Sequence, residues 1–153
     1  MPAFTFNVAK GRIRELVKRV DANDPADAKL ILVPFSTSMS EATGQDALTL
    51  TAVKALITER TTGSWVRKTL TDADISSTDY DDDLAGNLGP ASITQVTWTA
   101  PAAANDTLSL VICYNQESSP TDAATVPLTY HDFVVTTDGN DVVINAGDFF
   151  RAS

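Results

Sequence analysis

The second half of the chain carries short runs of alternating apolar and polar residues, and this pattern limits the fold more than any other feature. From Ser64 onward, β-branched and aromatic residues recur at every second position, as they do in strands that bury one face. The segment 133–144 is the clearest case, because two β-branched runs flank Asp138 and Gly139. An Asp-Gly pair between such runs favours a tight turn, so we expect a β-hairpin here.

The same pattern predicts further strands in this half, at 65–70, 93–98, 106–114, 125–130 and 132–137. One apolar run in the first half, 29–35, also predicts a strand. Pro34 lies near its end, and proline cannot donate to a ladder, so we expect an edge or the end of the strand there.

Two helices are predicted in the N-terminal half. The first has four apolar residues at the i, i+3, i+4, i+7 spacing of one helix face: Ile13, Leu16, Val17 and Val20. Asn7 is its expected N-cap, and the segment 21–25 ends it because Pro25 disfavours helix at the residue before it.

The second helix is expected at 46–60, after a loop at 36–45 that is rich in Ser, Thr and Gly. Its apolar face holds Leu50, Val53, Leu56 and Ile57. Gly63 follows at a place where a left-handed C-cap is common.

These elements predict a mainly β fold of the α+β class, a β-sandwich or barrel of about six strands with two helices in the N-terminal half. The length of 153 residues is typical of one hydrophobic core, so we expect a single domain over 1–153. Residues 1–6 carry Phe4 and Phe6 and are expected to form a short N-terminal arm anchored against protein.

The net charge of −9 is unevenly divided along the chain. Residues 1–68 hold ten basic and seven acidic residues, whereas residues 69–153 hold one basic and thirteen acidic residues. Such an acidic body repels nucleic acid, so we expect no direct nucleic-acid partner. The sequence has no apolar run long enough to cross a membrane and does not begin like a secretory signal, which predicts synthesis in a cytoplasm and no membrane partner.

Catalytic motifs are not expected in this chain. Cys113 is the only cysteine and lies in an apolar strand, where a small buried side chain is the simplest interpretation. Tyr130, His131 and Asp132 could begin a Ser/His/Asp triad, but adjacency in sequence is not triad geometry and no serine lies in a nucleophile elbow. We expect His131 at a strand edge, no catalytic residues and no cofactor.

The acidic segment 72–83 invites a calcium interpretation. Asp79, Asp81 and Asp83 have the spacing of the first three ligands of an EF-hand loop, but Leu84 and Pro90 replace the required glycine and glutamate. We therefore expect a solvated loop, no metal site and no effect of chelators on stability. The segment 86–90 lacks the lysine of a phosphate loop and predicts a turn.

The first helix also carries a basic stripe from Lys10 to Arg19. Such a stripe could touch nucleic acid or a membrane surface, but it lacks interleaved aromatic residues. Packing against the acidic body or against a partner is the expectation.

Five segments together suggest a family: 4–16, 21–25, 67–74, 127–133 and 149–153. They resemble small proteins of tailed bacteriophages that are found alongside major capsid proteins. The resemblance implies a virion structural protein, first of all a capsid decoration (cement) protein that binds the major capsid protein and copies of itself. Assembly would occur in the host cytoplasm, and the protein would be a homo-oligomer in the finished particle.

Two alternatives remain open at this point. Within the virion, the chain could be a head–tail connector or a tail component. From another class, it could be a cytoplasmic β-sandwich enzyme or a carbohydrate-binding module. A concave pocket with convergent polar groups favours the second alternative, whereas flat apolar patches at the N-terminal arm favour assembly.

Overall fold

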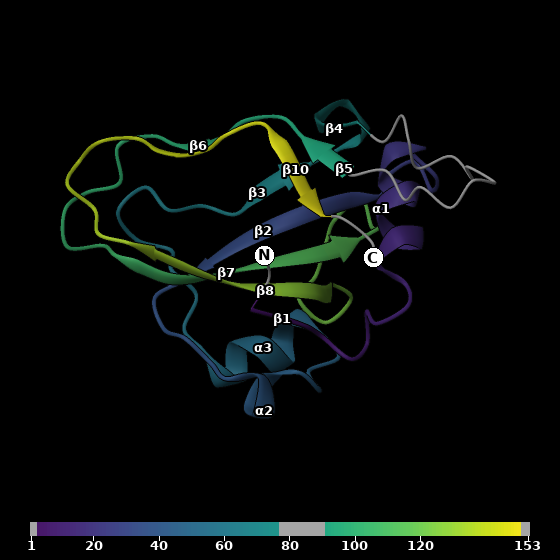
Figure 1. Cartoon of the computed structure of the whole chain (residues 1–153), viewed down its shortest axis with the longest axis horizontal. Coiled ribbons are helices and arrows are strands. Elements are labelled where there is room, and N and C mark those ends of the chain that lie inside the picture. The colour runs from purple at the N-terminus through teal and green to yellow at the C-terminus, as the bar shows by residue number, and fades with distance from the viewer. Residues whose placement is uncertain (1–2, 77–90, 151–153) are drawn as a thin grey trace.

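The computed structural model of the protein describes residues 3–76 and 91–150. An antiparallel sheet of five strands forms the middle layer, with short helices on one face and two smaller sheets on the other (Figure 1). The mainly β prediction is confirmed, and none of the sheets among the described residues closes into a barrel.

The main sheet contains β1 (Phe4–Thr5), β2 (Lys29–Phe35), β3 (Lys68–Leu70), β7 (Thr107–Asn115) and β8 (Val126–Val135). Its spatial order is β1-β8-β7-β2-β3, and every neighbouring pair is antiparallel. The predicted strand at 29–35 is confirmed as β2, which is inside the sheet and buried on both faces. Burial on both faces explains its nearly continuous apolar sequence.

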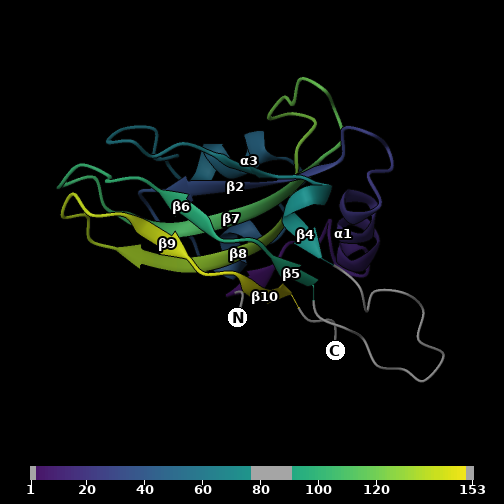
Figure 2. The same ribbon diagram turned by 90° about the horizontal axis from the view of Figure 1, so that it is seen from above.

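The smaller sheets lie over one face of the main sheet (Figure 2). One has the order β10-β5-β4, from β4 (Ile75–Ser76), β5 (Ala91–Ile93) and β10 (Gly147–Phe150). The other pairs β6 (Val96–Trp98) with β9 (Val142–Ile144).

Helices cover the remaining surfaces of the main sheet. Helix α1 (Ile13–Asp21) closes one end, and α2 (Glu41–Gly44) and α3 (Leu50–Leu56) lie on the face opposite the smaller sheets (Figure 1). A 3-10 turn, η1 (Asp72–Asp74), precedes β4. The described helices all lie in the N-terminal half, as predicted, and α2 occupies part of the segment that we expected to be a loop.

Two apolar cores lie on the two faces of the main sheet. The core on the side of α1 and the smaller sheets is centred on Trp65 and Trp98, whose ring centroids are 5.1 Å apart. The core on the side of α3 includes Phe6, Phe35 and Tyr130. Residues of β2 alternate between these cores, which is how one strand supports both layers.

The N-terminal segment is part of the body. Phe4 and Thr5 pair with Tyr130 and Thr129 of β8, and the Phe6 amide donates to Leu128 O at 3.1 Å. Phe4 and Phe6 are both buried. Of the expected arm at 1–6, residues 3–6 instead form an edge of the main sheet, because aromatic side chains gain more from this chain's own core than from solvent; Met1 and Pro2 lie outside the described residues.

Helix α1 buries the predicted face but begins later than expected. Its N-cap is Arg12, with no capping hydrogen bond from the side chain. Gly11 has a φ of +78°, which breaks the helical path before Ile13. Asn7, the predicted N-cap, is held elsewhere, because its amide donates to Gln45 O at 2.7 Å.

Helix α3 is shorter than the predicted helix at 46–60. Thr49 caps it by accepting from the Ala52 amide at 3.2 Å. It ends at Leu56 because the next residues pair with the end of β2, where the Arg60 amide donates to Pro34 O at 2.9 Å. Gly63 is not its C-cap; a Cβ there would lie 2.5 Å from Asn105 Cγ, so a close approach excludes a side chain.

Three predicted strand boundaries are wrong for local reasons. The segment 93–98 divides between β5 and β6, because Thr94 turns to hydrogen-bond Asp74 through both its amide and its hydroxyl. Only the end of 65–70 pairs, as β3. Conversely, most of 125–130 and 132–137 belongs to one continuous strand, β8, which ends at Val135.

The predicted hairpin at 133–144 is also wrong. Strands form on both sides of the Asp-Gly turn, but β8 pairs with β7 and β9 pairs with β6. The link between them crosses from the main sheet to the smaller one. Thr137 anchors it: the buried hydroxyl donates to Ala102 O at 2.8 Å, and the amide donates to Asp106 Oδ1 at 2.8 Å.

Candidate functional site

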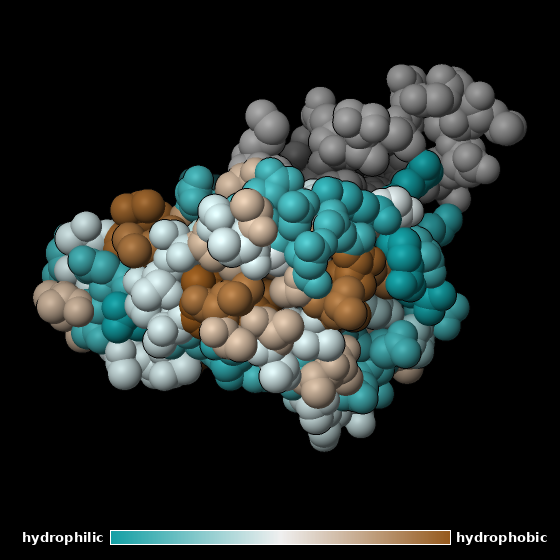
Figure 3. All heavy atoms as spheres, turned by 90° about the horizontal axis from the view of Figure 1, so that it is seen from below, coloured by the Kyte–Doolittle hydropathy of each residue, from teal (hydrophilic) through white to brown (hydrophobic). Residues whose placement is uncertain are grey.

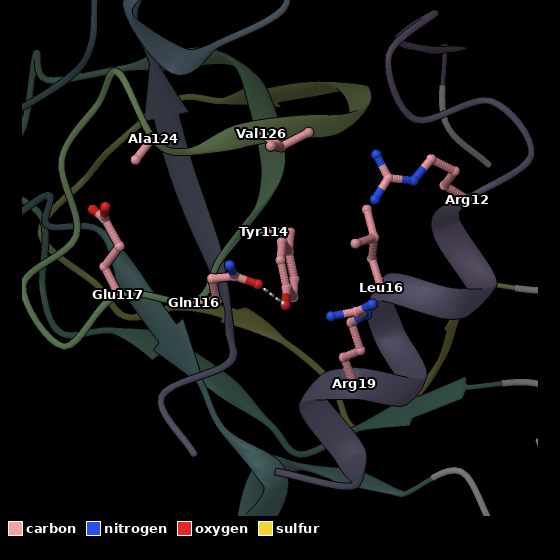
Figure 4. A pocket seen from close by; sticks show the side chains of 8 residues that line it. All are labelled: Arg12, Leu16, Arg19, Tyr114, Gln116, Glu117, Ala124 and Val126. Atoms are coloured by element: carbon pink, nitrogen blue, oxygen red, sulfur yellow. Dashed lines mark hydrogen bonds between the residues drawn. The ribbon is translucent and has the colours of Figure 1, made fainter. Parts of the chain in front are cut away.

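A pocket of about 360 Å³ opens between α1 and the neighbouring ends of β7 and β8 (Figure 4). Arg12, Leu16 and Arg19 line it from the helix. The opposite wall comes from the end of β7, the loop that follows and the start of β8: Tyr114, Gln116, Glu117, Ala124 and Val126. The pocket therefore joins two parts of the chain that are about 100 residues apart in sequence.

Arg12 and Arg19 line the pocket from the same side of α1, about two turns apart. Glu15, one turn from each, pairs with both: its carboxylate lies 2.9 Å from Arg19 Nη2 and 3.6 Å from Arg12 Nε. Neither contact uses the whole guanidinium, which carries five N–H donors. Figure 4 shows both guanidinium groups directed toward the opposite wall. Glu15 thus orients two donors and leaves part of each one for a ligand.

Tyr114 and Gln116 supply polar groups on the side of the sheet. The Tyr114 hydroxyl donates to Gln116 Oε1 at 3.2 Å, which leaves the amide nitrogen of Gln116 as a donor (Figure 4). Burial raises the pKa of Tyr114, so the hydroxyl stays protonated at neutral pH. Both groups are neutral, and the amide nitrogen of Gln116 can donate to a ligand oxygen.

Side chains of Asn115 and Lys29 hold the loop beside the pocket through hydrogen bonds. Asn115 Oδ1 accepts from the Glu117 amide at 2.7 Å, and Lys29 Nζ donates to Glu117 O at 2.8 Å. The buried Asn115 side chain also donates to Thr125 Oγ1 at 2.9 Å. These bonds hold both sides of the loop without any bound ligand, so this wall is preformed.

A second surface of interest is the α3 face, by which we mean the exposed side chains of Leu48, Leu56 and Val134. Their exposed fractions are 63%, 50% and 73%. Val134 belongs to this face because its neighbours Phe133 and Val135 pack against the core on the other face of the sheet, and successive side chains of a strand point to opposite faces. Figure 3 shows brown apolar areas distributed between hydrophilic residues on this side of the molecule.

The structure gives His131 a structural place. It lies on β8 opposite Leu110, beyond the two residues that β1 covers, in agreement with the expected strand edge. Its Nε2 lies 2.9 Å from Thr129 Oγ1. Asp132 follows on the same strand, where successive side chains point to opposite faces, so the two do not form a His–Asp pair. Cys113 is buried as predicted, and burial raises the pKa of its thiol.

Burial of His131 predicts a pH dependence of stability. Burial lowers the pKa of His131 to about 4, against an ordinary value of about 6.5. As the pH falls below 6.5, the unfolded chain therefore takes up a proton that the folded chain does not, and stability falls. We expect a loss of about 2 kcal/mol between pH 6.5 and pH 5, measured by urea unfolding.

The variant His131→Gln serves as the control, because His131 is the only histidine. Its stability should be nearly constant over this pH interval. A slope of the same size in the variant would assign the effect to carboxylates instead.

The predicted acidic loop is not placed by the structure. Asp79, Asp81 and Asp83 lie outside the described residues, as does the segment 86–90. Among residues 3–76 and 91–150, no group of three or more His, Cys, Asp or Glu side chains is arranged to hold a metal ion. No helix in these ranges is both long and apolar enough to cross a membrane.

The basic stripe was the only part of the pocket that the sequence indicated. Arg12 and Arg19 belong to the basic segment Lys10 to Arg19 and line the pocket, while the apolar face of α1 packs in the core. Tyr114, Gln116 and Val126 were missed as site residues. Their alternation and turn positions indicate strands and a loop, and no local pattern indicates that α1 packs beside them.

Comparisons with protein-family models, with characterised proteins and with solved structures find no match to this chain. Its function is therefore inferred from its own residues.

Proposed function

We propose that this protein is a structural component of a tailed-phage virion, which binds and stabilises the capsid shell as a decoration protein. Its partners would be the major capsid protein and further copies of itself. The α3 face is the observation that carries the proposal, because it offers three large exposed apolar side chains whose burial against a partner would be favourable. The five segments that resemble phage proteins supply the identity of the assembly.

The distribution of charge supports docking onto a larger surface. The chain carries a net charge of −9, which would steer it toward a basic partner. Leu48 and Leu56 would then supply affinity by burial, since apolar anchors mainly set dissociation and charges mainly set association. High salt should accordingly slow docking more than it strips protein already bound.

The α3 face favours this role over an enzyme, whereas the pocket at α1 leaves a ligand-binding role open. A connector or tail component would use the same kind of surface. The amount of this protein that binds to the shell distinguishes the decoration role from the connector or tail role.

The test compares the heat resistance of purified shells, from the phage that encodes the protein, with and without added protein. A protein that binds only the intact shell stabilises it, so saturated shells should disrupt at a higher temperature. The double variant Leu48→Ser/Leu56→Ser should bind at least about tenfold more weakly, since each leucine contributes about 1.5 to 3 kcal/mol when buried.

The matched control is Val143→Ser, which removes an exposed apolar side chain from β9 on the other side of the main sheet. It should bind like the original protein. Equal disruption temperatures at saturating occupancy would contradict the decoration role and favour a connector or tail role. Unchanged binding by the double variant would remove the α3 face from the interface.

A further inference from the structure

We infer that the pocket between α1 and the 116–126 segment is a binding site for a carboxylate that carries a small apolar group. This goes beyond the proposed role on a shell and does not depend on it, because the pocket lies at the end of the main sheet rather than on the α3 face (Figure 1). The carboxylate could belong to the end of a peptide or to a free organic acid, and both offer the same chemistry.

The guanidinium groups select a planar anion. Arg12 and Arg19 lie on the same wall, and Glu15 holds the Nε side of each. The remaining N–H donors point across the pocket in the fork that matches two carboxylate oxygens. The amide nitrogen of Gln116 on the opposite wall can donate to an oxygen that the arginines do not reach, whereas the Tyr114 hydroxyl already donates to Gln116 Oε1.

Three apolar residues also line the pocket, together with Glu117 at its far side, and they set the shape of the ligand. Leu16 lies between the two guanidinium groups, and Ala124 and Val126 lie on the opposite wall (Figure 4). A volume of about 360 Å³ is at the small end of ligand pockets, which range from roughly 300 to 1,000 Å³. A group the size of a leucine or valine side chain fits beside a bound carboxylate in this space.

The local charge distinguishes a carboxylate from a phosphate. Arg12, Arg19 and Lys29 contribute three positive charges around the pocket, and Glu15 and Glu117 contribute two negative ones. One unit of positive charge remains, which compensates a monoanion but not a dianion. The net charge of −9 over the whole chain disfavours polyanions further.

The test uses calorimetric titration of the full chain with N-acetyl-leucine and with N-acetyl-leucinamide. The amide has the same shape without the charge and should bind at least about tenfold more weakly, since a hydrogen bond to a charged group contributes about 1.5 to 3 kcal/mol. Arg12→Gln and Arg19→Gln should each weaken binding of N-acetyl-leucine by about tenfold. Lys10→Gln removes the same charge from an exposed position that does not line the pocket, and should change binding less than about twofold.

Thermal unfolding of each variant checks that the fold is intact, and amide NMR shifts of Gln116 and Tyr114 locate the ligand independently of affinity. An acetyl-tripeptide ending in leucine distinguishes the sources: tighter binding than N-acetyl-leucine assigns the pocket to a peptide end, and equal binding assigns it to a free acid. Equal binding of acid and amide would overturn the inference. So would tighter binding of inorganic phosphate, or an effect of Lys10→Gln as large as those of the arginine variants.

Discussion

Replacing Phe6 by alanine is expected to lower the free energy of unfolding by about 3 to 5 kcal/mol, the range for a fully buried phenylalanine. Phe6 has no exposed surface, and its ring lies edge-on to that of Phe4 with the centroids 5.2 Å apart. Phe4 in turn stacks on Tyr130 at 4.8 Å. The cavity left by Phe6 would therefore open inside the core beneath α3, where the neighbouring rings cannot close it.

Urea unfolding measures this change, and Thr5→Ala is the matched control. Thr5 lies between the two phenylalanines on β1 and is only partly buried, so its replacement should cost less than about 1 kcal/mol. If residues 1–6 were an arm that serves a partner, both substitutions would leave the isolated protein nearly unchanged. A loss below about 1 kcal/mol for Phe6→Ala would restore that interpretation.

The sequence predicts burial well, because local alternation reports which side of a strand faces a core. The positions of β2 and β7 and the apolar face of α1 follow from such patterns. The pairing of the strands does not follow from such patterns. The Asp-Gly turn at 138–139 favours a hairpin locally, yet Thr137 is fixed by the loop that contains Ala102 and Asp106, and the chain crosses to another sheet. Hydrogen bonds between residues far apart in sequence determine which strand β9 pairs with, and local sequence patterns do not report such bonds.

The candidate site was predictable only in part for the same reason. A basic stripe on an amphipathic helix is visible in the sequence, but a pocket needs a second wall. Tyr114 and Val126 belong to β7 and β8, which lie about 100 residues from α1 in sequence and reach it through the pairing of the main sheet. The exposed leucines of the α3 face were likewise missed, because Leu56 belongs to the predicted apolar face of its helix. Leu50, Val53 and Ile57 of that face are buried, whereas Leu56, the last residue of the helix, is exposed.

Replacing Arg67 by methionine is expected to destabilise the protein by about 3 kcal/mol, because it breaks a partly buried ion cluster. Arg67 holds Glu59 through two hydrogen bonds of 2.6 and 2.7 Å and Asp122 through one of 2.6 Å. Lys54 pairs with the same two carboxylates at 2.9 and 2.7 Å. The cluster thereby joins the end of α3, the approach to β3 and the loop before β8.

The carboxylates show why the loss is large. The Glu59 side chain is only 8% exposed, and although burial alone would raise its pKa, hydrogen bonds from Arg67 and Lys54 hold that pKa below the ordinary value. Hydrogen bonds from Arg67 lower the pKa of Asp122 to about 2. Without Arg67, two neighbouring carboxylates share one lysine. Methionine keeps the packing of the arginine stem, so the change isolates the lost charge.

A double-mutant cycle with Glu59→Gln measures the pair itself. Removing both partners should cost less than the sum of the single losses, with a coupling energy of about 1 to 3 kcal/mol. The control is Arg19→Met, which breaks an exposed pair with Glu15 on α1 and should cost less than about 1 kcal/mol. The Arg67→Met loss should also shrink as the pH falls from about 4 toward 2, because the contribution of the pair is complete above the ordinary pKa of Asp122 and is lost as the pH falls toward its folded value of about 2. Additive single losses, or an equal effect of Arg19→Met, would show that the cluster contributes no more than ordinary surface pairs do.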